Sequence, residues 1–399
     1  MPNLISCEGE NMSAPQIPNL LSLRGSRGRG RGRGRGGHPT RSSRSGAQSD
    51  ETIQGTDTDA AVSRLSAVTL GYLEDRYAEH FVSGPAIRRL PIINRGTYTR
   101  TSTLDLLINA FLSSSGSKTP TSSSPSASAA QLQTKQIISL GAGTDTRYFR
   151  IRDQNLHKNV IYHEFDFPRV TEVKYRVVQN SPSLRNQENV FRRFDGPDGE
   201  TSAEAAEWGY LNNIDGKDQC GYICHPLDLR NLTSLPSLQS LRSLRDDIPT
   251  LIISECCLCY FEVDIARDII KWFQDKIPSL GIVLYEPIGS NDSFGQMMVS
   301  NLAARNIVMP TVQRYKTLDD QKERLVELGF GNPDGDQKAV SIEHIWNKWI
   351  PNEEKRRVDR LEGLDEVEEW ILLAQHYGVV WGWSGGSEWD CWSELPVVT

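Results

Sequence analysis

The stretch at residues 136–150, QIISLGAGTDTRYFR, decides the fold class. It begins as a short apolar run rich in β-branched residues and passes directly into Gly141-Ala-Gly143-Thr-Asp-Thr. This pattern predicts a strand, a tight turn and the start of a helix. Glycines allow a ligand to approach the backbone, and Thr144 or Asp145 can cap the helix. The third glycine of the dinucleotide fingerprint is missing, so the turn suits a compact ligand, with an ordinary tight turn as the alternative.

A second strand is predicted at residues 160–168, VIYHEFDFP. Its carboxylates Glu164 and Asp166 are two residues apart, so they point to the same side. An acid at the carboxyl end of the second strand of such a fold accepts hydrogen bonds from ribose hydroxyls. We choose Asp166 over Glu164 because it is the last residue before the Phe-Pro break.

Two further strands also end in polar residues. Residues 221–227 predict a third strand followed by Asp228 and Leu229, and residues 250–254 a fourth followed by Glu255. Open α/β sheets bind ligands at the carboxyl ends of their strands. The sequence therefore predicts one α/β domain with a doubly wound sheet and a ligand site at that edge.

Five motifs in fixed order then resemble the leucine carboxyl methyltransferases, in particular a fungal-type member. They are LGAGTDTRYFR, EFDFP, PLDLR, SECCLCYF and EPIGSNDSFGQMM, preceded by VTLGY and INRGTYTR. Motifs in fixed order outweigh single matches. The resemblance covers residues 60–383 and implies a class I S-adenosylmethionine-dependent methyltransferase fold with a mostly parallel seven-stranded sheet and N-terminal lid helices. The implied strand order is 3-2-1-4-5-7-6.

The resemblance also implies the cofactor and the residues that hold it. S-adenosylmethionine would be bound by two arginines at the methionine carboxylate, by the glycine loop, and by acids at the strand ends. By position these are Arg64, Arg100, Gly141, Asp166 (ribose), Asp228 and Leu229 (adenine), and Glu255 (methionine end).

The activity that the resemblance implies is methyl-esterification of the C-terminal leucine of the protein phosphatase 2A catalytic subunit, which regulates phosphatase assembly. A carboxylate is already anionic at pH 7, so we expect no general base. Arg100 and Tyr260 would only position the reactants. An interface with the folded subunit would involve the lid near Arg88 and the segment near Met297.

Composition separates a tail from a body. Residues 1–71 contain no aromatic residue except histidine, and residues 27–37 form an Arg-Gly tract. Residues 1–49 hold eight arginines and two glutamates, whereas the whole chain has a formal net charge of −7. We predict a disordered tail at 1–57 and a methyltransferase domain at 58–399. The tail is either a solvated segment or a weak contact for RNA or acidic partners.

Within the domain, helical spacing is expected at residues 61–81 and 104–112. Residues 113–134 form a Ser-rich loop and residues 181–219 a polar insertion. Later helices are predicted at 261–276, 291–305 and 317–328, and strands at 281–285 and 377–383. Residues 384–399 receive no role.

The cysteines at 220, 224, 256 and 259 could be paired into a zinc site. The implied strand order puts the third strand at an edge, away from the fourth, so we interpret Cys256, Cys257 and Cys259 as buried apolar thiols and predict no metal.

No apolar run approaches the roughly 18 residues of a membrane span, and cysteine is sparse, so we expect a cytoplasmic protein with reduced thiols. We also expect it to be a monomer. Two other functions stay open. One is a relative that methylates a carboxyl group of tRNA wybutosine, although no repeat with a period near 50 residues is present. The other is an RNA-binding Arg-Gly protein with a vestigial domain.

Overall fold

The computed structural model describes residues 44–114, 133–185, 190–194, 206–214, 217–331, 335–393 and 395. The Arg-Gly tract and residues 115–132 of the Ser-rich loop lie outside this set.

A nine-stranded mixed sheet forms the centre of the molecule, in the order β3-β4-β5-β2-β1-β6-β7-β9-β8. Strands β5, β2, β1, β6 and β7 are parallel, while β9 is antiparallel to β7 and β8. The strands are β1 Lys135–Leu140, β2 Val160–Asp166, β3 Arg192–Arg193, β4 Trp208–Ile214, β5 Lys217–Pro226, β6 Thr250–Glu255, β7 Leu280–Pro287, β8 Gln337–Ser341 and β9 Tyr377–Ser384.

The predicted order of seven strands, 3-2-1-4-5-7-6, is confirmed: it corresponds to β5-β2-β1-β6-β7-β9-β8 of the sheet. The expectation that the third strand lies at an edge is wrong. The polar insertion contributes β3 and β4, and β4 pairs antiparallel with β5. Trp208 and Tyr210 on β4 are buried, so aromatic packing fixes this added hairpin against the body.

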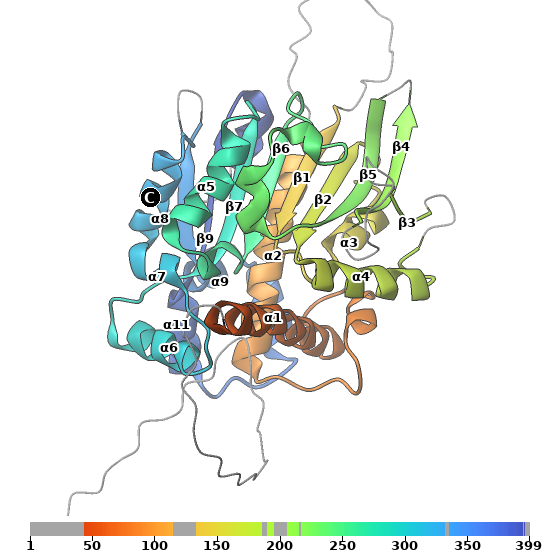
Figure 1. The fold of residues 1–399 in the computed structure, drawn as a ribbon. Helices are drawn as coiled ribbons and strands as arrows, with labels where there is room; N and C mark the ends of the chain where they lie inside the picture. Colours follow the sequence, from red (N-terminus) through yellow and green to blue (C-terminus); the bar gives the residue numbers. More distant parts are fainter. Residues whose placement is uncertain are drawn as a thin grey trace, which may run out of the picture.

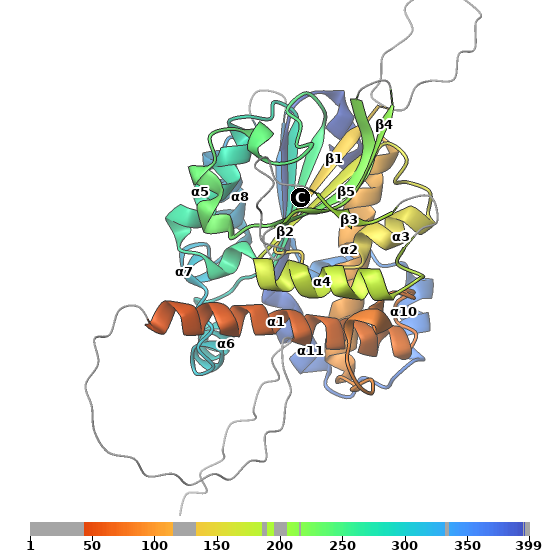
Figure 2. The same cartoon turned by 45° about the vertical axis from the view of Figure 1, so that its right-hand side comes forward.

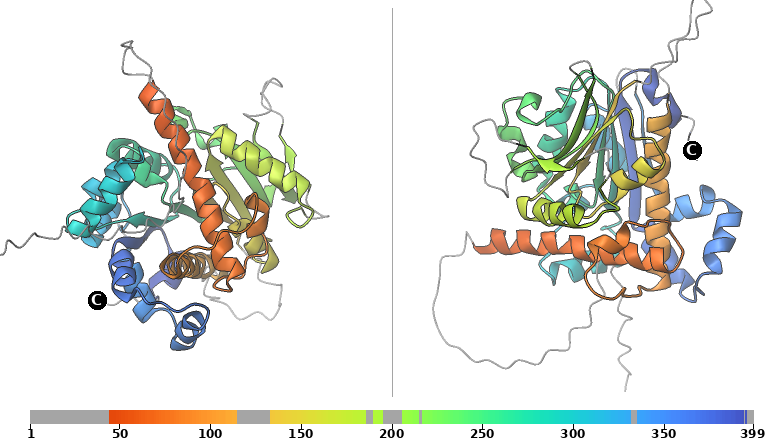
Figure 3. Two further views of the ribbon diagram at one scale, coloured as in Figure 1. Left: turned by 90° about the horizontal axis from the view of Figure 1, so that it is seen from below. Right: turned by 90° about the vertical axis from the view of Figure 1, so that its right-hand side faces the viewer.

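Alternate residues of the central strands enter two different cores. Ile137 of β1 belongs to the core beneath α2 Pro91–Ser113, α3 Arg147–Asp153 and α4 Pro168–Asn180. Ile138 belongs to the core beneath α5 Val263–Gln274 and α8 Leu318–Glu327. Both side chains are fully buried. Strands buried on both faces are typical of doubly wound sheets covered by helices, as Figures 1 and 3 show.

The first helix, α1 Arg44–Thr69, lies across the carboxyl ends of the parallel strands (Figure 2). It begins inside the predicted tail, so the boundary at residues 57 and 58 is wrong. It also ends before residue 81: a turn and a short 3₁₀ helix, η1 Ala78–Phe81, follow it. Residues 50–57 of α1 are exposed or half-buried, and five of them line a pocket, which accounts for their polar composition.

Helix α2 Pro91–Ser113 begins at a proline and runs along the sheet, far longer than the predicted 104–112. The predicted helices after the fourth strand are confirmed as α5, α6 and α8, with shifted ends. The other helices are α3 Arg147–Asp153, α4 Pro168–Asn180, α5 Val263–Gln274, α6 Ser293–Ala303, α7 Pro310–Arg314, α8 Leu318–Glu327, α9 Ile342–Lys348, α10 Asn352–Asp359, α11 Val367–Gln375 and α12 Asp390–Ser393, with 3₁₀ segments η2 Leu229–Ser234, η3 Leu238–Ser240, η4 Leu258–Tyr260 and η5 Ser387–Trp389.

The C-terminal segment packs into the core. Trp389 stacks on Phe111 of α2 with ring centroids 4.8 Å apart, and Nε1 of Trp392 donates a hydrogen bond of 2.9 Å to the carbonyl of Leu107. Both tryptophans are fully buried. The segment that received no role from the sequence therefore holds α2 in place.

Within the described part of the chain, none of the helices has the length and apolar character that crossing a membrane requires.

Candidate functional site

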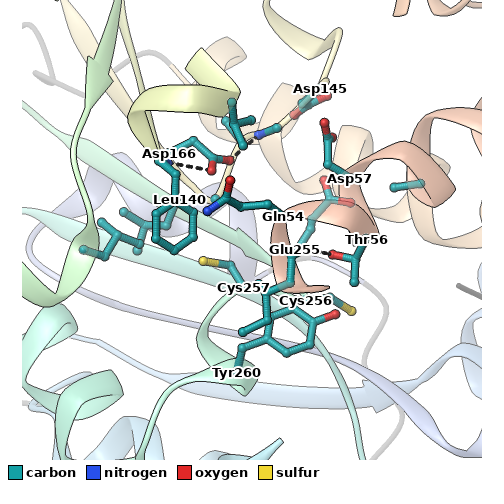
Figure 4. Close-up of a pocket in the computed structure, with 18 of the residues that line it drawn as sticks. Gln54, Thr56, Asp57, Leu140, Asp145, Asp166, Glu255, Cys256, Cys257 and Tyr260 are labelled. Carbon is teal, nitrogen blue, oxygen red and sulfur yellow. Dashed lines mark hydrogen bonds between the residues drawn. The ribbon is translucent and has the colours of Figure 1, made fainter. Parts of the chain in front are cut away.

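One pocket lies between α1 and the carboxyl ends of the parallel strands (Figure 4). Its walls come from α1, the turn after β1, and the ends of β2, β5 and β6. All of the residues predicted from the sequence line it: Arg64, Arg100, Gly141, Asp166, Asp228, Leu229, Glu255 and Tyr260. Segments up to about 200 residues apart in the chain therefore meet at one site, as expected for the edge of an open α/β sheet.

The glycine turn is closely surrounded by protein atoms. Gly141 and Gly143 have φ angles of +62° and +47°. A Cβ atom at Gly141 would lie 2.5 Å from Sγ of Cys257, and one at Gly143 would lie 2.3 Å from Oδ1 of Asp57. Both glycines are therefore required by backbone conformation and by close neighbours from the β6 loop and α1.

Asp166 is tied to the same turn by its carboxylate. Oδ2 accepts a hydrogen bond of 2.7 Å from the N–H of Gly143, and Oδ1 accepts one of 2.7 Å from the N–H of Phe167. Burial raises the pKa of Asp166 to about 7, with a further contribution from the charge of Asp57, although the two backbone hydrogen bonds oppose the shift.

Glu164, the alternative considered for this position, does not line the pocket. It is buried and pairs with Lys174 of α4, and it accepts a hydrogen bond of 2.6 Å from the hydroxyl of Tyr222. Lys174 also donates a 2.8 Å hydrogen bond to the carbonyl of Asp145. This buried pair therefore supports the glycine turn from behind.

Arg64 reaches the helix start that follows the glycine turn. It donates a hydrogen bond of 3.1 Å to Oγ1 of Thr146 and lies 3.7 Å from Oδ1 of Asp145. Arg100 of α2 approaches Glu255 at 3.4 Å through Nε, and this buried Nε has no hydrogen-bond partner in the described residues. Burial alone would lower the pKa of Arg100, but Glu255 holds it above its ordinary value.

Glu255 has a second cationic partner that the sequence did not reveal. Arg147, whose side chain is buried, pairs with Glu255, Asp145 and Asp105. Arg147 lies within the motif LGAGTDTRYFR but was assigned no role from the sequence, and only the fold brings it against Glu255 of β6. Because Arg147 occupies one oxygen of Glu255, Arg100 is left incompletely paired beside the pocket.

At the other end of the pocket, Asp228 caps η2 by accepting a 3.0 Å hydrogen bond from the N–H of Arg230. The Arg230 guanidinium pairs with Asp228 at 2.6 Å and with Asp50 of α1 at 2.7 Å. Leu229 is buried beside them. This ion pair joins the first turns of α1 to the end of β5.

A second, smaller cavity adjoins the first. It is lined by Ala60, Ser63, Gly96, Thr97, Arg100, Cys256, Tyr285 and Tyr377. Arg100, Ala60 and Cys256 line both cavities, so the two spaces meet beside the guanidinium of Arg100.

The cysteines considered for a zinc site lie on, or directly after, separate strands of the sheet. Cys220 and Cys224 lie on β5, and Cys256, Cys257 and Cys259 follow β6, which is separated from β5 by β2 and β1. Among the residues described, no three His, Cys, Asp or Glu side chains gather in a group that could hold a metal ion.

Comparisons with known proteins agree on a family. The family model described as leucine carboxyl methyltransferase matches residues 52–274. The Leucine carboxyl methyltransferase 1 of Emericella nidulans is 43% identical over 96% of this chain and 98% of its own length. The tRNA wybutosine-synthesizing protein 4 of Rattus norvegicus is 29% identical over 87% of this chain, which spans 45% of that relative.

Among solved structures, the plantazolicin methyltransferase BpumL in complex with SAH is 10% identical, with a TM-score of 0.35, over 84% of this chain and 99% of that one.

The pocket suits the methyl donor of the matched family, S-adenosylmethionine. It has a glycine cradle that a Cβ would fill, an acid at the end of β2, and a buried arginine nitrogen without a hydrogen-bond partner in the described chain. The chain belongs to the leucine carboxyl methyltransferase family and is an S-adenosylmethionine-dependent carboxyl methyltransferase.

Proposed function

We propose that this enzyme methyl-esterifies the C-terminal leucine α-carboxylate of the protein phosphatase 2A catalytic subunit and thereby regulates assembly of the phosphatase holoenzyme. The observation that supports this most is the second cavity, which shares Arg100 with the cofactor pocket. A leucine terminus needs a small enclosed space for its side chain and a cation for its carboxylate.

Arg100 is suited to receive that carboxylate. Its guanidinium lies 5.1 Å from the ring centroid of Tyr285, and its Nε has no hydrogen-bond partner within the described residues. An arginine held by an aromatic ring and by one carboxylate keeps donors for a second anion. Arg147 contributes by binding Glu255, which would otherwise pair more fully with Arg100.

Different residues of the larger pocket are suited to different parts of the methyl donor. Asp166 would bind the ribose, and Asp228 and Leu229 would bind the adenine. The backbone at Gly141 would meet the methionine part, with Arg64 and Arg100 at its carboxylate and Glu255 facing its end. When bound, the donor supplies an electrophilic methyl group on sulfur. The chain contributes placement and exclusion of water, because an ionised carboxylate attacks without a base.

Tyr260 is suited to positioning. Burial, followed by the neighbouring cysteines, raises the pKa of its hydroxyl well above the ordinary value. Tyr260 therefore remains a neutral hydrogen-bonding group at physiological pH.

The test uses purified enzyme, labelled S-adenosylmethionine and two forms of the phosphatase catalytic subunit, one complete and one lacking the terminal leucine. Label is expected on the complete form only, and mild base should release it as methanol. Equal labelling of both forms, or label that survives base, would contradict the proposal. Transfer to tRNA in a parallel reaction would favour the wybutosine function instead.

We further propose that the enzyme acts in the cytoplasm as a monomer and that residues 1–43 add at most a weak contact with RNA or acidic partners. The acidic balance of the whole chain supports a protein acceptor over a phosphate backbone.

A further inference from the structure

Six acidic residues line the cofactor pocket, and arginines neutralise four of them. Asp50 and Asp228 pair with Arg230, Asp145 pairs with Arg147 and Arg64, and Glu255 pairs with Arg147 and Arg100. The remaining two, Asp57 and Asp166, form no ion pair in the part of the chain that the structure describes. Asp166 already accepts two backbone hydrogen bonds and is the proposed ribose ligand.

Asp57 lies on the lid helix α1 and presses against the glycine turn. Its Oδ1 accepts hydrogen bonds of 2.7 Å from both the N–H and the hydroxyl of Thr144. Its Oδ2 accepts no hydrogen bond from any described residue. Burial raises the pKa of Asp57, opposed by the Thr144 hydrogen bonds and by the positive charges of Lys174 and Arg64. The pocket therefore contains a desolvated carboxylate with one oxygen uncommitted.

Arg64 follows Asp57 by seven residues, which is two turns, so both side chains lie on the same face of α1. Asp57 contacts Thr144, while Arg64 contacts Thr146 and Asp145. An anion and a cation from one helix thus converge on three consecutive residues of the turn. The methionine part of the donor carries an α-ammonium and an α-carboxylate on one carbon, which is the complementary arrangement of charges.

We propose that Asp57 binds the α-ammonium group of the methyl donor, beside Arg64 at its carboxylate. Four of the other acids of the pocket are already paired with arginines, and both oxygens of Asp166 accept backbone hydrogen bonds. A desolvated carboxylate is stabilised by a partner of opposite charge, and the ammonium is such a partner. The proposal adds a role for the N-terminal half of α1: the helix closes over the pocket by contacting the ligand directly. It concerns the donor alone and does not depend on which carboxylate is methylated.

The test measures binding by calorimetry without any acceptor. The ligands are S-adenosylhomocysteine and its deamino analogue, in which hydrogen replaces the α-ammonium. The proteins are the wild type, Asp57→Asn and the control Glu51→Gln, which removes an exposed charge from the same helix. The amide at position 57 can still accept the hydrogen bonds of Thr144.

The wild type should bind S-adenosylhomocysteine about tenfold to a hundredfold more tightly than the deamino analogue, the range for a hydrogen bond between charged groups. Asp57→Asn should reduce this preference to about threefold or less, and Glu51→Gln should keep it. If Asp57→Asn weakens both ligands equally, or leaves the preference intact, the proposal is overturned. Asp57→Ser provides the same comparison should the amide variant fold poorly. Because no acceptor is present, a negative result would count against the role of Asp57 and not against the proposed leucine acceptor. A failure of the methylation test would likewise leave the role of Asp57 standing.

Discussion

The backbone N–H of Gly143 donates a hydrogen bond of 2.7 Å to Oδ2 of Asp166, so the turn after β1 and the end of β2 are joined at the wall of the cofactor pocket. The same carboxylate is the acid proposed to bind the ribose. Its environment, which raises the pKa to about 7, links cofactor binding to pH.

We predict that lowering the pH from 8 to 6 weakens binding of the donor to the wild-type enzyme several-fold. The ionised form of Asp166 accepts the ribose hydrogen bonds, and protonation of the unliganded site competes with them. Asp166→Ala should lower affinity by about 1–3 kcal/mol at pH 8 and remove most of this pH dependence. Calorimetry at both pH values checks the prediction, and an Asp166→Ala variant that keeps the wild-type dependence would contradict it.

The same pKa shift predicts how the stability of the unliganded enzyme depends on pH. A carboxyl whose folded-state pKa is raised to about 7 contributes stability that is present below its model value of 3.8 and is lost as the pH rises through 7. Relative to Asp166→Asn, the wild type should therefore lose on the order of 1–3 kcal/mol between pH 4 and pH 7.5. Urea denaturation without cofactor measures this difference, and a constant difference across the range would refute the shift.

Much of the site could be predicted because its residues adjoin strands. Asp166, Asp228 and Glu255 each follow an apolar run, and a parallel sheet brings such positions to one edge. Asp57 and Arg147 could not be found in this way. Asp57 lies in a polar segment without aromatic residues, and Arg147 meets Asp105 of α2 and Glu255 of β6 only in the folded chain. Trp389 and Trp392 were missed because their contacts lie on α2, more than 270 residues earlier in the chain.

The position of those tryptophans gives a prediction on stability. Trp392→Ala should lower the free energy of unfolding by about 3–5 kcal/mol, since it leaves a cavity and an unpaired carbonyl at Leu107. The control Ile371→Ala, on an exposed position of α11, should change it by less than about 0.5 kcal/mol. Chemical denaturation of the two variants checks this, and similar losses for both would contradict it.

The start of α1 at Arg44 leads to a prediction on truncation. Deleting residues 1–43 leaves the whole helix, so we expect unchanged affinity for S-adenosylhomocysteine and an unchanged Tm. Deleting residues 1–60 removes Asp57 and the pocket-lining turns before it, and should weaken binding at least about tenfold. Calorimetry and thermal melts compare the two proteins. A large loss caused by the shorter deletion would show that residues 1–43 also contribute.

The pH dependence of methyl transfer identifies the nucleophile. With donor and acceptor both saturating, the single-turnover rate should be nearly constant from about pH 6.5 to pH 9, because a terminal carboxyl is ionised throughout this range. Saturating donor also keeps Asp166 ionised, which separates this measurement from the binding prediction above.

Two groups that might have titrated are excluded by their surroundings. Burial raises the pKa of Tyr260 well above its ordinary value, and burial together with His225 lowers the pKa of His163 well below its own. His163 and His225 share a buried hydrogen bond of 2.9 Å, and neither lines the pocket. An amine or ring nitrogen acceptor would instead need to lose a proton, so a tenfold rise in rate per pH unit below neutrality would show that the attacking group is not a carboxylate.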